Sequence, residues 1–251
     1  IGQRVPRVDI PEKTDGSAKF GIDVWFPDMV FAAIRHCPTL GGTLAATPAK
    51  PSGAIALVPC KASDSRGAVT AGTTNAFAVV ASNTWLAMKL AKSVSATWTL
   101  PASTAGIDSA QILAQANALA RSGPALVAEP APPTGQTPAS YAAVVEPQVA
   151  AALGTPTIDA TYTLPYLAHV TMEVLNCTVN VTFSGAAPQR CEIWAPTQSS
   201  ATVANVAKAL TGLPPTQIVV HTTLLGGGLG RKFEMDYVSQ AIQVALVVKK
   251  P

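Results

Sequence analysis

The chain has 251 residues, of which 48% are hydrophobic and 12% are charged, and its net charge is +3. The charged fraction is roughly half of that in an average soluble domain, so we expect much of the surface to be covered inside the molecule or by another subunit. No lysine and arginine cluster is interleaved with aromatic residues and no apolar run is long enough for a transmembrane helix, which argues against a nucleic-acid-binding protein and against a membrane span.

The first hundred residues predict a mixed module of strands and one helix. Short β-rich runs are separated by proline, glycine and aspartate, and residues 82–84 supply the N-cap of an amphipathic helix over 85–94. The expected strands are 18–25, 30–34, 54–58, 77–81 and 96–100. We therefore assign residues 1–102 to an α/β module.

Alanine and proline dominate residues 103–156, where seven prolines interrupt any longer pattern. One helix is predicted over 109–121, and Gly123 closes it. We interpret this stretch as a crossing segment between two domains.

Residues 157–251 predict a second mixed domain, which makes the expected fold class α+β. The expected strands are 160–164, 177–183, 192–195 and 217–225, with helices over 200–210, ending at Gly212, and over 236–248. The last helix is apolar on nearly all sides, so it should be buried. A helix of this kind needs neighbours on several sides, and we expect further sequence or another chain to supply some of them.

The four cysteines, Cys37, Cys60, Cys177 and Cys191, do not have the spacing of a zinc or iron–sulfur site. They are expected to be buried thiols, or to form one or two disulfides if the chain is exported. Either way, this chain holds no iron–sulfur cluster.

A glycine-rich loop follows the predicted strand 217–225 and consists of Gly226, Gly227, Gly228, Leu229, Gly230 and Arg231. Glycines let a backbone approach a ligand closely and adopt positive φ, so that amide N–H groups can point at an anionic or planar group. The pattern is neither a dinucleotide fingerprint nor a P-loop. Taken alone, the loop fits a ligand site and a tight strand-to-helix connection equally well.

Two further features lie upstream of this loop. Gln198 ends the segment Trp194–Gln198 just before a helix, and taken alone it is expected to cap that helix or to reach its own backbone. His169 and Glu173 are four residues apart, so on a helix or turn they would share a face. Because two ligands make a poor metal site, a buried hydrogen-bonded pair is the expected arrangement there.

Together these segments resemble the large, molybdopterin-binding subunit of isoquinoline 1-oxidoreductase-type molybdenum hydroxylases, in the xanthine dehydrogenase and aldehyde oxidase superfamily. The matching segments are collinear and extend over nearly the whole chain. They are Val5–Pro11, Lys13–Val24, Met29–Pro38, Pro165–Cys177, Trp194–Gln198, and Gly226–Arg231 with Asp236 and Tyr237.

The resemblance implies a cofactor and the residues that bind it. The cofactor is molybdopterin cytosine dinucleotide with molybdenum, held by the pterin and by no protein ligand to the metal. Gln198 matches the glutamine that binds an oxygen ligand of the metal, and Gly226–Arg231 match the loop beside the oxo group and the pterin. Residues 1–102 resemble a hammerhead-like module, and 157–251 resemble the first part of the molybdenum-binding domain. Leu229 replaces the usual phenylalanine, and Lys232 replaces a common second arginine.

The resemblance also implies a molybdenum-dependent oxidoreductase that is incomplete without further chains. The reaction is hydroxylation of an electron-poor carbon, such as that of an isoquinoline-like N-heterocycle, with water as oxygen donor and electrons passed to 2Fe–2S clusters on a small partner subunit. The general-base glutamate is expected in a C-terminal region beyond Pro251, so no catalytic residue is assigned in this chain, and neither Glu173 nor Glu234 lies in that motif.

Two alternatives remain open. One is an aldehyde dehydrogenase of the same molybdenum family that passes electrons to a cytochrome c subunit, and the other is a non-catalytic exported scaffold or binding protein. A periplasmic location, with a partner providing any membrane association, is expected for the enzyme, and a cytoplasmic location is the alternative.

Overall fold

The computed structural model describes residues 2–64, 66–122, 131–155, 158 and 160–251. The chain separates into two compact units. The first combines Ile1–Thr104 with His169–Pro251, and the second is Ala105–Ala168. The division into residues 1–102, 103–156 and 157–251 was based on composition and predicted elements and not on contacts in space, and it stays a prediction.

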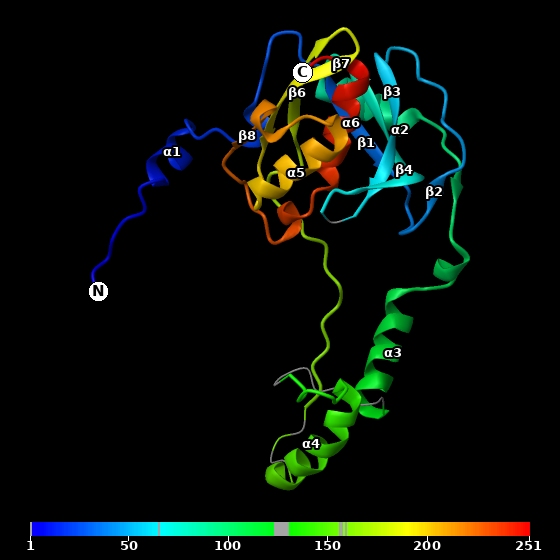
Figure 1. Cartoon of the computed structure of the whole chain (residues 1–251), viewed down its shortest axis with the longest axis vertical. Coiled ribbons are helices and arrows are strands. Elements are labelled where there is room, and N and C mark those ends of the chain that lie inside the picture. Colours follow the sequence, from blue (N-terminus) through cyan, green and yellow to red (C-terminus); the bar gives the residue numbers. More distant parts are fainter. Residues whose placement is uncertain (1, 65, 123–130, 156–157, 159) are drawn as a thin grey trace. The chain divides into compact units, whose positions relative to one another are not determined.

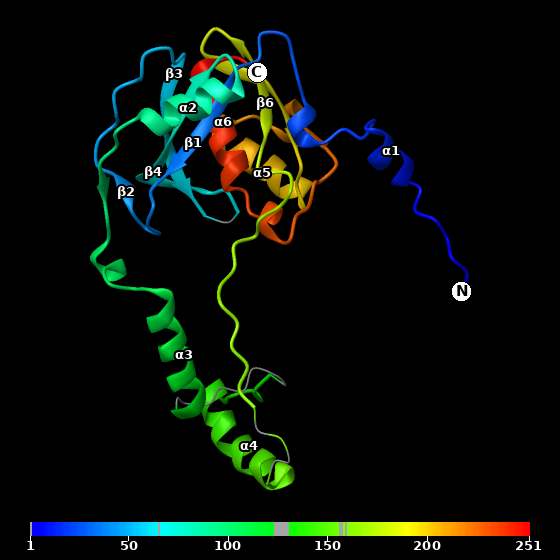
Figure 2. The same ribbon diagram turned by 180° about the vertical axis from the view of Figure 1, so that it is seen from behind.

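The first unit contains the β-sheets of the described chain, two with three strands each and one with two strands (Figures 1 and 2). Its strands are β1 (Phe31–His36), β2 (Thr43–Leu44), β3 (Ala56–Ser63), β4 (Val69–Ala81), β5 (Trp98–Thr99), β6 (Thr178–Ser184), β7 (Ala187–Ala195) and β8 (Ile218–Thr222). Its helices are α1 (Ile10–Asp15), α2 (Thr84–Ser93), α5 (Ser200–Thr211) and α6 (Asp236–Val248), with 3-10 turns at Gly21–Asp23, Ala102–Thr104, Pro215–Gln217 and Arg231–Phe233.

The first sheet has the order β1-β4-β3, and both pairings are antiparallel. Side chains of β4 alternate between its two faces, as the two-residue period of a strand requires. Phe77 and Val79 pack with Ala91 of α2, while Ala78 and Val80 pack on the other face with Val244 of α6. Helices therefore cover both faces of this sheet.

The second sheet has the order β6-β7-β8, and β7 pairs with β8 in parallel. A parallel pair needs a crossover, which α5 supplies between the two strands. The helix ends at Gly212, which has the left-handed conformation (φ 72°) and closes α5 through its N–H to the carbonyl of Lys208. The crossover brings the end of β8, and the loop that follows it, beside the end of β7.

Helix α6 lies between the two three-stranded sheets and contributes to both of their cores (Figure 1). Val238 and Ile242, which are fully buried, pack against the β6-β7 side and α5, whereas Val244 packs against β3 and β4. This position explains why the helix is apolar on nearly all sides and confirms that it is buried.

The second unit contains α3 (Ser109–Ser122) and α4 (Pro138–Leu153). Thr137 caps α4 by accepting a hydrogen bond from the N–H of Ser140. Pro138 occupies the first turn, where the backbone N–H that proline lacks would have no partner within the helix. Pro147 lies inside the helix. The sequence predicted α3 correctly but not α4, because the prolines were interpreted as breaks.

Most predicted elements are confirmed and two strands are wrong. Residues 18–25 form a 3-10 turn and a single bridge, Phe20 with Leu224, and residues 160–164 have no regular structure. Helix α1 was also not predicted. Gly123, predicted to close α3, lies outside the described residues. Mixed sheets and helices confirm the α+β class, and none of the described helices is long and apolar enough to cross a membrane.

Candidate functional site

The glycine-rich loop follows β8 and makes two close approaches that leave no room for a side chain. A Cβ on Gly226 would overlap the Cβ of Glu173, and a Cβ on Gly228 would lie 2.8 Å from Oε1 of Gln198. Glycine is needed at these two positions because of neighbouring atoms. The second approach also places the side chain of Gln198 against the loop.

Backbone conformation explains the other glycines of the loop. Gly227 and Gly230 have φ of 93° and 87°, in the region that glycine adopts most readily, and Leu229 has a left-handed φ of 52°. The N–H of Arg231 donates to the carbonyl of Gly228 (2.9 Å) and closes the turn. Within the described part of the chain, the N–H groups of residues 227–230 donate to no other group. Four consecutive donors are thus available to a ligand.

Gln198 is tied to the same loop through the backbone. Its N–H donates to the carbonyl of Lys232 (3.1 Å), and the hydroxyl of Thr197 donates to the same carbonyl (3.3 Å). The side chain of Gln198 is exposed. The structure therefore brings together the glutamine and the glycine-rich loop, 28 or more residues apart in the sequence, as the prediction of a shared site requires.

Glu173 forms the buried support of this loop. Its Oε2 accepts from Nζ of Lys232 (2.6 Å) and from the N–H of Gly226 (2.9 Å), and its Oε1 accepts from the N–H of Ile22 and from Nδ2 of Asn176, both at 3.2 Å. The side chains of Lys232 and Glu173 are 0% and 5% exposed. Both oxygens of the buried carboxylate therefore accept two hydrogen bonds each, so neither is left unsatisfied.

The pKa of Glu173 reflects this balance. Burial by itself would raise it, but the hydrogen bonds from Lys232, Gly226, Asn176 and Ile22 outweigh burial and lower the pKa below its usual value. The carboxylate is therefore charged at neutral pH and acts as an acceptor. It is not poised to take up a proton, which agrees with leaving it out of the catalytic residues.

The predicted pairing of His169 with Glu173 is wrong. The side chain of His169 is exposed, in a segment without regular structure, while Glu173 is buried and paired with Lys232. The two residues share no helix, so their four-residue spacing does not bring them together. Lys232 departs from the pattern of the resembling family, but no pattern in the sequence identifies its partner.

The guanidinium of Arg231 binds another side chain of the protein. It makes two hydrogen bonds to the carboxylate of Asp236, at 2.9 and 2.7 Å, at the start of α6. The fork holds the loop to the helix and keeps the pKa of Asp236 low against the effect of burial. Arg231 thus shapes the turn, and a direct contact of its side chain with a ligand stays a prediction.

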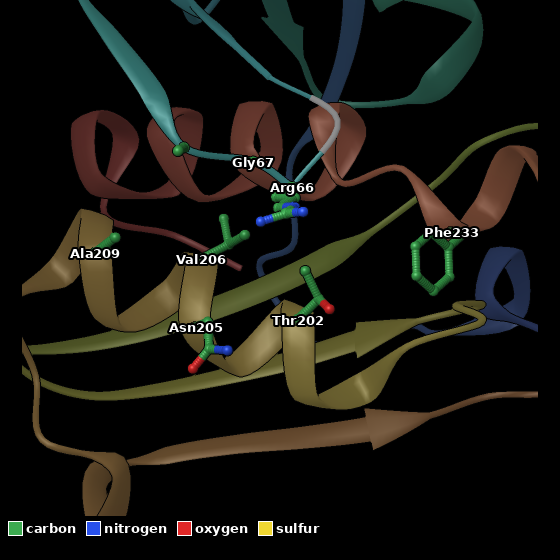
Figure 3. Close-up of a pocket in the computed structure, with 8 residues that line it drawn as sticks. Arg66, Gly67, Thr202, Asn205, Val206, Ala209 and Phe233 are labelled. Atoms are coloured by element: carbon green, nitrogen blue, oxygen red, sulfur yellow. The ribbon is translucent and has the colours of Figure 1, made fainter. Parts of the chain in front are cut away.

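A groove of about 610 Å³ lies beside this site (Figure 3). It lies between α5, which carries Thr202 and Val206, and the loop that carries Arg66, and Phe233 lines it as well. Phe233 lies two residues after the glycine-rich loop, and the hydroxyl of Thr202 lies 2.7 Å from that of Ser199, next to Gln198. No sequence pattern marks this groove, because its residues come from three separate segments.

Protein side chains do not form a metal centre in the described residues, where no group of three or more histidine, cysteine, aspartate or glutamate side chains is placed to hold an ion. The four cysteines are all free thiols, and Cys60 and Cys191 are buried.

Residues 137–251 match the molybdopterin cofactor-binding domain family. The whole chain is also similar to the isoquinoline 1-oxidoreductase subunit beta of Brevundimonas diminuta, with 27% identity and 30% of that protein covered. Both matches include Gln198 and the glycine-rich loop.

Two solved structures share the fold. Quinoline 2-oxidoreductase from Pseudomonas putida 86 has a TM-score of 0.63 at 16% identity, with 100% of this chain and 34% of that chain covered. A Cu,Mo-CO dehydrogenase in its carbon monoxide reduced state has the same TM-score and identity, with 99% and 34% covered. The chain thus spans about a third of the length of the relatives that it matches.

Proposed function

We propose that this chain belongs to the molybdopterin-binding oxidoreductases, because residues 137–251 match a molybdopterin cofactor-binding domain and the whole chain is similar to an isoquinoline 1-oxidoreductase subunit. In this proposal, the loop Gly226–Arg231 and Gln198 bind the oxygen-rich part of a molybdopterin cofactor. The complete protein then oxidises a small organic molecule at that cofactor.

One observation supports this assignment more than any other. The four free N–H groups of residues 227–230 and the exposed amide of Gln198 lie at one place, where Gly228 leaves room for close approach. Fixed neutral donors of this kind suit an anionic, oxygen-bearing group without supplying a ligand to the metal. The residues present therefore fit the cofactor.

In this proposal, the chain holds the cofactor and orients it. When bound, a molybdenum–pterin group supplies two-electron oxidation with water as the source of oxygen. The N–H groups of the loop would stabilise negative oxygen, and the Gln198 amide would fix its orientation. Because these groups are already in place, little reorganisation is required when charge develops.

We further propose an N-heterocycle as the substrate, hydroxylated with water, since the relative from Brevundimonas diminuta is named for isoquinoline. The finer assignments are the cytosine dinucleotide form of the cofactor, 2Fe–2S clusters on a partner subunit, a hammerhead-like module in residues 1–102 and a periplasmic location. An aldehyde substrate with electron transfer to cytochrome c is the alternative within the same family.

Metal analysis of the complete protein, purified from its natural host with its partners, tests the proposal. We expect about one equivalent of molybdenum and about four of iron, the content of two 2Fe–2S clusters. Finding neither metal would instead support a non-catalytic scaffold. Assays of isoquinoline and of an aldehyde with an artificial electron acceptor then separate the two substrates, and cell fractionation tests the location.

A further inference from the structure

One carboxylate oxygen holds both ends of the glycine-rich loop. Oε2 of Glu173 accepts from the N–H of Gly226, at the start of the loop, and from Nζ of Lys232, just after its end. The N–H of Glu173 also donates to the carbonyl of Gly226 (2.9 Å). The two ends are thus held at a fixed separation by a residue more than fifty positions upstream.

Lys232 also connects this support to Gln198. Its carbonyl accepts from the N–H of Gln198 and from the hydroxyl of Thr197, while its ammonium group binds Glu173. A displacement of Lys232 would therefore move the loop and the glutamine together. No other residue of the site contacts both through hydrogen bonds that the described structure contains.

The loop needs such external support because its own amides are free. The N–H groups of residues 227–230 make no bonds to the described chain, so apart from the turn bond from Arg231 to Gly228, hydrogen bonds at the two ends of the loop determine where they point. A buried ion pair adds little net stability compared with apolar side chains of similar size, but it fixes the geometry of the groups that it joins.

We propose that Glu173 and Lys232 are positioning residues, which hold the loop Gly226–Arg231 and Gln198 at the spacing required to bind the cofactor. This inference rests on the proposed function for the identity of the ligand. The support of the loop itself can be tested without any ligand.

The experiment compares variants of the complete protein, isolated with its partners. Lys232→Met and Glu173→Gln remove one partner, Glu173→Met with Lys232→Met removes both charges, and Lys232→Arg keeps a cation. Glu192→Gln is the matched control, because Glu192 pairs with Arg190 on the exposed surface of β7. Hydrogen exchange is measured at the amides of Gly226 and Gln198 and across α2, and molybdenum and pterin contents are determined.

In the three variants without the pair, we expect exchange at Gly226 and Gln198 to be at least about tenfold faster, the factor for losing one hydrogen bond to a charged group. Exchange in α2 should not change, and bound molybdenum and pterin should fall together. Lys232→Arg should stay close to the wild type, as should Glu192→Gln.

If a single variant fails to fold, the double variant Glu173→Met with Lys232→Met still tests the proposal, because it leaves no unpaired buried charge. Unchanged exchange at both amides in the folded double variant would overturn the proposal, and so would equal acceleration throughout the protein. Full cofactor content with a loosened loop would overturn it as well. A wild-type protein without molybdenum or pterin contradicts the proposed function instead, while the exchange data still test the support of the loop.

Discussion

The side chain of Gln198 is exposed and lies against Gly228, so its amide is accessible to a ligand that reaches the glycine-rich loop. The position of this amide depends on the backbone bond from Gln198 to Lys232 and not on contacts of the side chain itself. A substitution that keeps the shape of the side chain can therefore remove the donor without disturbing the fold.

Gln198→Glu replaces the amide N–H donors with a carboxylate of nearly the same shape. We expect kcat of the complete enzyme to fall about 10²–10³-fold, as for other preorganised donors, because a negative charge faces the oxygen-bearing group. The free energy of unfolding should change by less than about 0.5 kcal/mol, since the side chain is exposed. Gln189→Glu, at an exposed position of β7, is the control and should leave kcat unchanged.

The two close approaches of the loop predict different costs for an added methyl group. Gly226→Ala places a Cβ on Glu173, 3.3 Å from its backbone nitrogen, so backbone must move and about 1–3 kcal/mol of unfolding free energy should be lost. Gly228→Ala meets only the flexible end of Gln198, so its cost should be smaller although the amide is displaced. Urea denaturation measures both, and a larger loss for Gly228→Ala would contradict the structure.

At the level of elements, α6 joins the two three-stranded sheets of the first unit. One part of its surface packs into the core of the β6-β7-β8 sheet and another into the core of the β1-β4-β3 sheet. Asp236 at its start binds Arg231, so the helix also holds the end of the glycine-rich loop. Packing and site geometry therefore depend on the same helix.

Ile242→Ala should create a cavity between these layers. Because Ile242 is fully buried, we expect a loss of about 2–5 kcal/mol in the free energy of unfolding. Val247→Ala is the control on the same helix, since Val247 is 59% exposed, and it should change stability by less than about 0.5 kcal/mol. Thermal unfolding of the complete protein separates the two, and equal effects would show that α6 is not buried as described.

At the scale of the whole molecule, the low fraction of charged residues corresponds to many exposed apolar side chains. Large apolar side chains in residues 158–172 are mostly exposed, including Tyr162, Leu164, Tyr166 and Met172, each at least 88%. Such a surface is unusual for a free monomer. We expect this segment to be covered in the complete protein.

The redox state is also a property of the whole chain, because all four cysteines are free. We expect iodoacetamide to modify all four in the denatured protein without any reductant, as detected by mass spectrometry. In the native protein, Cys60 and Cys191 should stay unmodified, since burial raises their pKa to about 12 and about 11. A thiol that reacts only after reduction would reveal a disulfide that the structure does not contain.

The sequence by itself determined the elements whose signals are local. Asn83 caps α2, Gly212 ends α5 and the apolar pattern of 236–248 forms α6, as predicted, because caps and periodicity act within a few residues. It also determined that Gln198 and the glycine-rich loop belong together, through their resemblance to a family. Prolines misled the prediction at α4, where the first turn accommodates Pro138 and a long helix continues past Pro147.

Only the tertiary structure decided which residues support the site. Glu173 meets Lys232 across 59 positions of the chain, and Ile22 adds a donor from the N-terminal region. No local pattern encodes such a contact, because it depends on how β8, α5 and the segment before β6 are brought together. The spacing of His169 and Glu173 suggested a pair, but Glu173 is buried and pairs with Lys232 instead. A buried carboxylate is stable only where an opposite charge and several N–H groups surround it.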